Sequence, residues 1–272
     1  MKLKLWDVLG QESPLQIVGV INAYAAIMAK EVGFRALYLS GAGVANISYG
    51  IPDIGKTTLE NVLEDALRIT QAVDLPLLVD IDTGWDKPEE TIRAMEEIGV
   101  AGVHIEDQEL KKKCGHLNDK KIISTSEMCE RIRACIEARK DPQFVVMART
   151  DAYANEGIDK TLERLHAYKQ AGAGMIFPEA MPKLSLYQTI KQSIRLPVLA
   201  NLTEFGKTPL FTLEEVKEAG IDIALYPLSA NRAMNLAALK VFQEIRQKGT
   251  QKNLLEIMQT RDELYHFLKY MG

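Results

Sequence analysis

Two aspartates separated by one residue, Asp80 and Asp82, end the apolar run LPLLVDID. On an extended strand, residues two apart point to the same side, so both carboxylates would face one site. Glu106 ends the next apolar run along the chain. Carboxylate oxygens suit Mg²⁺, which binds through one or two carboxylates and keeps waters and substrate as its other ligands. The spacing therefore favours a metal site, although helix capping or an ion pair with Arg149 would use the same residues.

A thiol in a cationic stretch is the second candidate for chemistry. Cys114 follows three lysines and precedes Gly115 and His116 in the run KKKCGH at 111–116. Neighbouring positive charge lowers the pKa of a thiol, and an accessible thiolate or thiol serves as nucleophile or proton donor. A run of lysines is also typical of an ordinary solvated surface, so the stretch alone leaves both interpretations open.

The other cysteines and the histidines offer less chemistry. Cys129 and Cys135 lie in a helical pattern and are predicted to be inert packing residues. No histidine has zinc-site spacing to a second ligand. His104 sits in the middle of an apolar run and is predicted to be a core residue.

The stretch GIPDIGKT at 50–57 matches the phosphate-binding pattern G-x-x-x-x-G-K-[ST]. A phosphate-binding loop must leave a strand directly into its first glycine and then open a helix. Here the nearest predicted strand stops at Ser40, and Gly41 and Gly43 intervene. We therefore set aside a nucleoside triphosphate site.

The elements that must position these residues follow a repeated unit: a helical stretch, a short apolar run, and a polar residue at its end. The apolar runs are continuous rather than alternating, which is typical of strands buried on both faces of a parallel sheet. The predicted strands are IVGVIN (17–22), ALYLS (36–40), LPLLVDID (75–82), GVHIED (102–107), FVVMARTD (144–151), GMIFPE (174–179), LPVLAN (196–201) and DIALYP (222–227).

The stretches between these runs carry helix start and stop signals. Capping-box spacing, in which Ser or Thr precedes Glu by three residues, occurs at Thr57/Glu60, Ser124/Glu127 and Thr212/Glu215. Pro88 followed by two glutamates is typical of a first helical turn. Glycines that would end helices precede four of the runs, at Gly33, Gly99, Gly172 and Gly220.

Eight strands alternating with helices predict an α/β fold, a (β/α)8 TIM-type barrel, with a doubly wound sheet as the second interpretation. No linker divides the chain, so residues 1–272 are predicted to form one domain. The functional groups of such a barrel lie at the carboxyl ends of its strands. The predicted strand ends carry Asn22, Ser40, Asp80, Asp82, Glu106, Asp107, Arg149, Asp151, Glu179, Asn201, Thr203, Ser229, Asn231 and Arg232. Residues 228–272 exceed what one barrel helix needs and are predicted to pack on another subunit.

Composition excludes several classes of protein. The 272 residues hold 33 Lys and Arg against 37 Asp and Glu, a net charge of −4, which argues against nucleic acid as a partner. Three cysteines do not suggest a secreted disulfide framework, and no apolar run is long enough to span a membrane. We expect a cytoplasmic protein.

The chain from about residue 5 onward resembles the isocitrate lyase/phosphoenolpyruvate mutase superfamily, and within it the lyases that cleave 2-methylisocitrate. KKCGH (112–116) together with the paired aspartates is the most specific part of this resemblance. The other motifs that carry it are YLSGAGVA (38–45), GIPDIG (50–55), DIDTG (80–84), HIEDQ (104–108), ARTDA (148–152), FPEA (177–180), NLTEFG (201–206) and SANRAMN (229–235).

The resemblance implies a barrel whose terminal helix is exchanged between subunits of a homotetramer. It also implies Mg²⁺-dependent cleavage of a tricarboxylate, (2S,3R)-2-methylisocitrate, to pyruvate and succinate in the methylcitrate cycle of propionate degradation. Mn²⁺ is an alternative ion.

The same resemblance assigns roles to residues of this sequence. Asp80 and Asp82 match metal-site aspartates, with Glu106 in the outer shell of the ion. Cys114 matches the proton donor, tuned by His116, and Tyr38 is our first choice of base for the hydroxyl, with Arg149 or Asp53 as alternatives. Substrate-binding positions are matched by Ser40, Gly41, Ala42, Asp53, Gly115, Arg149, Glu179, Asn201, Leu202, Thr203, Arg232 and Arg261.

Smaller sequence features distinguish the subfamilies of this superfamily. Phe177, Leu225 and Pro227 match the apolar wall that accommodates the extra methyl group of methylisocitrate. Isocitrate lyases carry a large insertion that this chain lacks, and phosphoenolpyruvate mutases lack the KKCGH cysteine. The alternative from another class of protein is a catalytically silent barrel that acts as a scaffold. Such a scaffold would tolerate the loss of site residues, and none of the matched positions is lost here.

Overall fold

The computed structural model describes residues 3–109 and 121–270. Eight parallel strands form one sheet in the order β6-β5-β4-β3-β2-β1-β8-β7. A parallel bridge between Ile176 and Val198 joins the two ends of this order, so that the sheet is nearly closed into a barrel. The strands are β1 (Leu15–Gly19), β2 (Ala36–Leu39), β3 (Leu77–Asp80), β4 (Gly102–Glu106), β5 (Val145–Thr150), β6 (Met175–Pro178), β7 (Leu199–Asn201) and β8 (Ile223–Tyr226).

The barrel predicted from the sequence is confirmed, and each predicted run contains a strand. The first strand is displaced, because β1 ends at Gly19 rather than at Asn22. Asn22 instead caps the next helix, since its side chain accepts a hydrogen bond from the Ala25 amide over 2.8 Å. Gly19 also has no room for a side chain, because an added Cβ would meet the Pro227 carbonyl oxygen at 1.7 Å.

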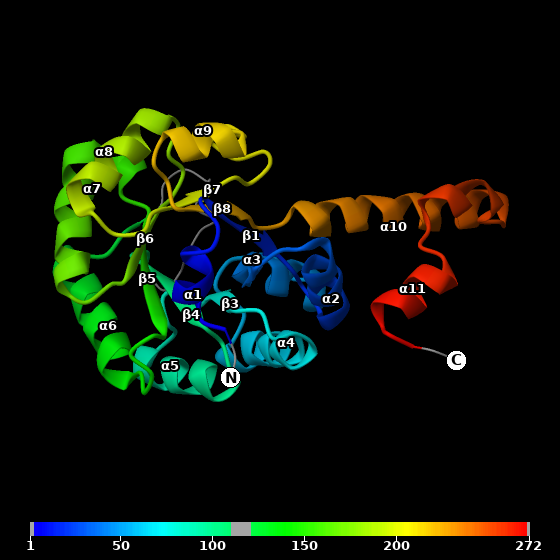
Figure 1. Cartoon of the computed structure of the whole chain (residues 1–272), viewed down its shortest axis with the longest axis horizontal. Coiled ribbons are helices and arrows are strands. Elements are labelled where there is room, and N and C mark those ends of the chain that lie inside the picture. Colours follow the sequence, from blue (N-terminus) through cyan, green and yellow to red (C-terminus); the bar gives the residue numbers. More distant parts are fainter. Residues whose placement is uncertain (1–2, 110–120, 271–272) are drawn as a thin grey trace.

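Helices surround the barrel (Figure 1). They are α2 (Ala23–Val32), α4 (Leu59–Ala72), α5 (Pro88–Glu97), α6 (Thr125–Ala138), α7 (Tyr153–Gln170), α8 (Leu184–Ile194) and α9 (Leu213–Glu218). The short helix α1 (Leu5–Leu9) precedes β1, and α3 (Gly41–Gly43) and the π-helix η1 (Val44–Ser48) follow β2. Leu5 and Val8 of α1 join the apolar side chains inside the barrel.

Two of the three predicted capping boxes are confirmed, at Ser124/Glu127 and Thr212/Glu215. The box predicted at Thr57/Glu60 is wrong by one residue, because Thr58 caps α4 with Asn61 as its partner. Thr57 is buried, and its carbonyl accepts a hydrogen bond from the Trp85 indole over 2.8 Å. That contact holds Thr57 in the loop before α4, so that the next residue, Thr58, occupies the N-cap position.

The chain after β8 leaves the barrel. Helix α10 (Ser229–Lys248) extends away from it, and the 3₁₀ helix η2 (Lys252–Ile257) and α11 (Arg261–Phe267) follow (Figure 1). Asn231 is buried on α10, whereas the apolar side chains of its later turns are exposed. The segment turns back toward α2, where the Tyr24 hydroxyl donates to Gln259 over 2.7 Å. Within the described ranges, no helix is long and apolar enough to cross a membrane.

Candidate active site

Polar side chains converge at the carboxyl ends of the strands, as the barrel geometry predicts. They lie in the last residues of six strands, β2 to β7, or directly after them, and each is at most 9% exposed although it is charged or polar. Buried polar groups need partners, and so many in one place indicate a binding site. The set comprises Ser40, Asp80, Asp82, Glu106, Arg149, Glu179, Asn201 and Thr203.

The two aspartates face the turn after β2. The amide of Gly41 donates to Asp80 Oδ2 over 3.1 Å, and the amide of Asp82 donates to Asp80 Oδ1 over 3.1 Å. A Cβ added to Gly41 would lie 3.1 Å from oxygens of both carboxylates, so these oxygens approach the same point. Asp82 has a φ of 50°, a left-handed conformation that brings its side chain back toward the site.

These carboxylates fit a hard divalent cation. Mg²⁺ usually keeps several waters and is bound by one or two carboxylates, so a full cage of protein ligands is not required. In the ranges 3–109 and 121–270, no group of three or more His, Cys, Asp or Glu forms such a cage. The donor set of Asp80 and Asp82, with Glu106 buried on the next strand, is that of an open site that leaves positions for water and substrate.

Arg149 provides positive charge among the carboxylates. Its guanidinium lies 3.0 Å from Asp151, 3.3 Å from Glu106 and 3.7 Å from Glu179. Burial lowers the pKa of Arg149, but the charges of these three carboxylates and of Asp80 outweigh burial and hold that pKa well above its usual value. The guanidinium also lies 5.3 Å from the ring centre of Phe177. Arg149 is therefore a permanent cation, able to bind a substrate carboxylate.

Tyr38 and His104 form a buried pair beside Asp80. The Tyr38 hydroxyl lies 2.9 Å from Nε2 of His104, and that nitrogen lies 3.6 Å from Oδ1 of Asp80. Burial first, and the charge of Asp80 second, raise the pKa of Tyr38 well above its usual value. Tyr38 is therefore a neutral hydroxyl that donates or accepts hydrogen bonds.

Glu179 and Asn201 offer hydrogen-bonding groups on the opposite side. The Asn201 amide donates to Glu179 Oε2 over 3.2 Å, and the amide of Ala180 donates to Oε1 over 2.8 Å. Oδ1 of Asn201 is buried and has no hydrogen-bond partner among the described residues. A buried acceptor without a donor is costly, so this oxygen suits a hydroxyl group of a ligand.

The proposed apolar wall also lies at this end. Phe177 and Leu225 belong to the cluster inside the barrel together with Tyr38, and Pro227 is buried just after β8. Leu202 and Thr203 are buried after β7, and the partly buried Asp53 follows η1 in the chain.

Other predicted site residues are placed less centrally. Arg232, in the first turn of α10, is partly exposed and pairs with Glu204 over 3.4 Å. Arg261 is exposed at the start of α11, which lies beside the barrel rather than over it (Figure 1). Within one subunit the structure therefore does not bring Arg261 to the carboxylates. Cys114, Gly115 and His116 lie outside the described residues.

His104 was missed as a site residue by the sequence analysis. It is fully buried, as predicted for a core residue, but its ring contacts Tyr38 and Phe177 within the site. The available signal was spacing, because His104 precedes Glu106 by two residues on β4 and so points to the same side of the strand.

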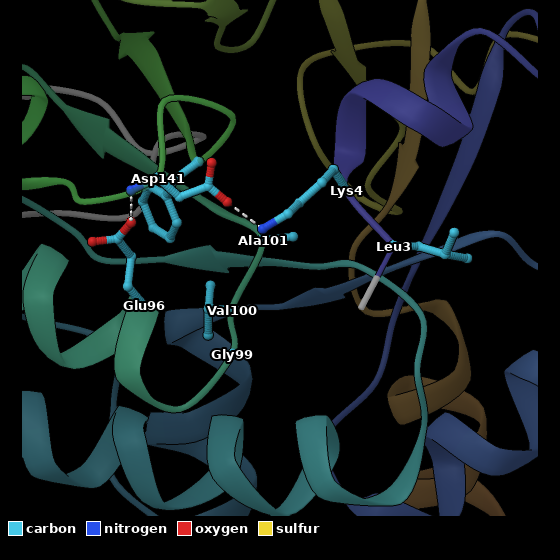
Figure 2. Close-up of a pocket in the computed structure, with 8 residues that line it drawn as sticks. Leu3, Lys4, Glu96, Gly99, Val100, Ala101 and Asp141 are labelled. Carbon is cyan, nitrogen blue, oxygen red and sulfur yellow. Dashed lines mark hydrogen bonds and ion pairs between the residues drawn. The ribbon is translucent and has the colours of Figure 1, made fainter. Parts of the chain in front are cut away.

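A separate cavity of about 100 Å³ lies at the amino-terminal end of the strands (Figure 2). Lys4 before α1 forms an ion pair with Asp141 there, and Glu96 accepts hydrogen bonds from the amides of Lys140 and Asp141. These contacts tie the N-terminal segment to the barrel. Groups at this end of a barrel serve stability rather than catalysis.

Comparison with known proteins gives consistent matches. The family model described as phosphoenolpyruvate phosphomutase matches residues 6–246. The chain is 55% identical to the 2-methylisocitrate lyase of Shewanella oneidensis, over 98% of this chain and 93% of that protein. It is 53% identical to the 2-methylisocitrate lyase of Salmonella typhimurium, over 96% and 90% respectively. The solved structure of 2,3-dimethylmalate lyase matches with a TM-score of 0.89 at 32% identity, covering 97% of this chain and 89% of that one.

Proposed function

The chain belongs to the phosphoenolpyruvate phosphomutase family, and from this we propose that it is a carbon–carbon lyase that cleaves (2S,3R)-2-methylisocitrate to pyruvate and succinate. The observation that carries the proposal is the 55% identity to a 2-methylisocitrate lyase along almost the whole chain. The carboxylates and the arginine at one end of the barrel agree with it, because they supply groups for a metal ion and for a substrate carboxylate. The enzyme is thus an oxo-acid lyase.

Asp80 and Asp82 would hold Mg²⁺, with Mn²⁺ as an alternative, and Glu106 would lie in the outer shell of the ion. A divalent metal accords with the superfamily to which the chain belongs. When bound, the ion supplies Lewis-acid stabilisation of negative charge on the substrate hydroxyl and on the departing keto acid.

Substrate binding follows from the charge and hydrogen bonding of the site. Arg149 and Arg232 would bind carboxylates, and the turn of Ser40, Gly41 and Ala42 would contribute main-chain amides. Glu179 and Asn201 would bind a hydroxyl or carboxyl oxygen, since Oδ1 of Asn201 is buried with no partner among the described residues. Asp53, Leu202, Thr203 and Gly115 are proposed to complete the pocket.

Cleavage requires two proton transfers. The substrate hydroxyl loses a proton and becomes the keto group of pyruvate, while the C2–C3 bond breaks and leaves its electron pair on the succinate carbon. We assign Cys114 as the donor that protonates this carbon, with His116 tuning the thiol. Tyr38 is the first choice for the group that accepts the hydroxyl proton, and because its own hydroxyl is neutral it would pass its proton to Nε2 of His104, 2.9 Å away, as it accepts the one from the substrate. Arg149 holds the substrate carboxylate during both transfers.

The wall of Phe177, Leu225 and Pro227 would contact the methyl group that distinguishes 2-methylisocitrate from isocitrate. One methyl group in an apolar pocket contributes about 1–3 kcal/mol to discrimination. The wall therefore favours the methylated substrate without abolishing cleavage of isocitrate.

The exposed apolar face of α10 supports assembly into a homotetramer with exchanged terminal helices. Leu239 and Phe242 are 50% and 68% exposed, although a solvated helix face is normally polar. The proposed exchange of terminal helices would bring α11 to the barrel of another subunit, which would give Arg261 a route to a substrate carboxylate. Light scattering after size-exclusion chromatography tests this assembly, and a monomer would contradict it.

We place the enzyme in the cytoplasm and in the methylcitrate cycle. Cys129 and Cys135 are free and buried, as suits a reducing compartment. Product identification by NMR tests the function: equal amounts of pyruvate and succinate from 2-methylisocitrate are expected. Other products, or unchanged substrate with folded protein and Mg²⁺, would refute the proposal.

A further inference from the structure

The guanidinium of Arg149 is held along one edge by Asp151. Nε of Arg149 donates to Asp151 Oδ2 over 3.0 Å, and Nη2 donates to Oδ1 of the same carboxylate over 3.4 Å. Nη2 also lies 3.3 Å from Glu106 and 3.7 Å from Glu179. Nη1 has no hydrogen bond or ion pair to another described residue. The carboxylates around Arg149 therefore leave Nη1 as its donor for a ligand.

Asp151 is fixed in turn by Asp107, which directly follows β4. The amide of Asp151 donates to Asp107 Oδ1 over 2.9 Å, and the hydroxyl of Thr150 donates to Asp107 Oδ2 over 2.7 Å. One carboxylate thus binds two consecutive residues at the end of β5. The backbone that carries Arg149 and Asp151 is therefore fixed at the carboxyl end of this strand.

The contacts behind Asp151 are deeply buried. Asp107 and Tyr168 have no exposed surface, and the Tyr168 hydroxyl on α7 donates to Asp107 Oδ2 over 2.8 Å. Arg164 lies 3.8 Å from the same oxygen and donates to the Tyr168 hydroxyl over 3.2 Å. Burying a carboxylate is costly even when its hydrogen bonds are satisfied, and apolar residues of the same volume often stabilise a fold equally well. A buried polar network behind Arg149 therefore indicates a role in fixing geometry.

We propose that Asp151 is a positioning residue, which orients the guanidinium of Arg149 so that Nη1 meets a substrate carboxylate, and that Asp107 and Tyr168 hold Asp151 in place. The inference rests on the proposed function, in which Arg149 binds a carboxylate of the substrate. An arginine side chain is long and flexible, so a guanidinium that is fixed before binding loses less freedom when the substrate binds. The role requires no contact between the substrate and Asp151, Asp107 or Tyr168.

The direction of the change in KM separates orientation from charge. Asp151 is a carboxylate and the proposed substrate is a tricarboxylate, so removing the charge of Asp151 would by itself strengthen substrate binding. Loss of the orientation of Arg149 would weaken substrate binding instead. A purely structural role would lower the amount of folded enzyme and leave KM unchanged.

Asp151→Asn is the test, because it keeps the shape of the side chain and removes its charge. We expect KM for 2-methylisocitrate to rise by about 10- to 100-fold, the range that corresponds to the loss of a charge-assisted hydrogen bond. The matched control is Asp222→Asn, directly before β8 and hence at the amino ends of the strands. Asp222 accepts hydrogen bonds from Lys191 over 2.6 Å and from the amide of Val198 over 2.8 Å. The control removes an ion-paired carboxylate at the opposite end of the barrel, so its KM should stay close to the wild-type value.

Tyr168→Phe tests the support behind Asp151, since it removes one hydrogen bond to Asp107 and no charge. KM should rise in this variant too, by less than in Asp151→Asn, and an unchanged KM would overturn the part of the proposal that concerns Tyr168. If Asp151→Asn does not fold, Tyr168→Phe takes its place as the test. A KM equal to or below the wild-type value in Asp151→Asn would overturn the proposal, and so would that result in Tyr168→Phe where it replaces Asp151→Asn.

A binding measurement keeps this inference separate from the lyase activity. Isothermal titration calorimetry with oxalate and Mg²⁺ measures the affinity for a small dicarboxylate without turnover. If the wild type does not cleave 2-methylisocitrate, the proposed function fails, whereas weaker oxalate binding in Asp151→Asn than in Asp222→Asn still supports the positioning role. Equal or tighter oxalate binding in Asp151→Asn would overturn that role, and so would a wild type that does not bind oxalate.

Discussion

The hydroxyl of Tyr38 lies 2.9 Å from Nε2 of His104, in the barrel interior beside Asp80. Strand β2 supplies the tyrosine and β4 the histidine, and their rings stack with centres 5.7 Å apart. The pair connects the apolar interior to the charged end of the barrel, because His104 also lies 3.6 Å from Asp80. Tyr38 is thereby held in one orientation at the site where we expect the substrate hydroxyl.

Tyr38→Phe should lower kcat by about 100-fold or more, since general acid–base groups typically contribute 10²–10⁴. KM for 2-methylisocitrate should change little, because the ring and the carboxylate-binding arginine remain. Steady-state kinetics with saturating Mg²⁺ measures both constants. A kcat within a few-fold of the wild-type value would move the base to Asp53, because the carboxylates around Arg149 raise its pKa and exclude the alternative that Arg149 is the base.

Gly41→Ala should weaken activation by Mg²⁺. The new Cβ would lie 3.1 Å from oxygens of Asp80 and Asp82, so the carboxylates must shift. A titration of activity against Mg²⁺ concentration should show a higher half-saturation point. Gly10→Ala is the control, because Gly10 has a φ of −77° and an added Cβ there meets nothing closer than 3.9 Å. Equal Mg²⁺ dependence in the two variants would contradict the assigned metal site.

Much of the barrel could be predicted because it depends on local pattern. Continuous apolar runs and polar strand ends predict parallel strands with a site at one end, and Asp80, Asp82 and Glu106 lie there as expected. Contacts between distant residues could not be predicted in this way. Tyr168 donates to Asp107 across 61 positions of sequence, and no spacing rule connects a residue on α7 with one that follows β4.

The position of Thr58 at the start of α4 shows a second limit of prediction from the sequence. Thr57 and Thr58 both suit a cap, and the choice depends on the Trp85 indole, which binds the Thr57 carbonyl from another loop. His104 shows the same limit for function. Its sequence environment is that of a core strand, and its contact with Tyr38 appears only when β2 and β4 are placed on the two sides of β3.

Leu225→Val should reduce the preference for 2-methylisocitrate over isocitrate. The variant removes one methylene from the apolar wall, which is worth about 0.8 kcal/mol and hence about a fourfold change in the ratio of kcat/KM values. Leu199→Val is the matched control, because Leu199 is equally buried in the same interior cluster but is not part of the wall. A ratio that changes equally in both variants would remove Leu225 from the specificity pocket.

Cys135 should resist alkylation in the native protein. Burial raises the pKa of its thiol to about 12, so almost no thiolate is present below pH 10, and burial also raises the pKa of Cys129. Raising the pH toward the thiol pKa increases the thiolate fraction. The difference in labelling between native and denatured protein is therefore largest near pH 8. Mass spectrometry should show both cysteines unmodified at pH 8 and modified in denaturant. Rapid native labelling of Cys135 would contradict its placement in the core.

The most direct test is a comparison of substrates with the purified chain: kcat/KM for pyruvate release from 2-methylisocitrate, beside glyoxylate release from isocitrate, with and without EDTA. We predict rapid pyruvate formation that EDTA abolishes and added Mg²⁺ restores, with much slower glyoxylate formation. Preference for isocitrate would contradict the assignment of Phe177, Leu225 and Pro227 to a methyl-binding wall. Folded protein inactive on both substrates would contradict the lyase itself.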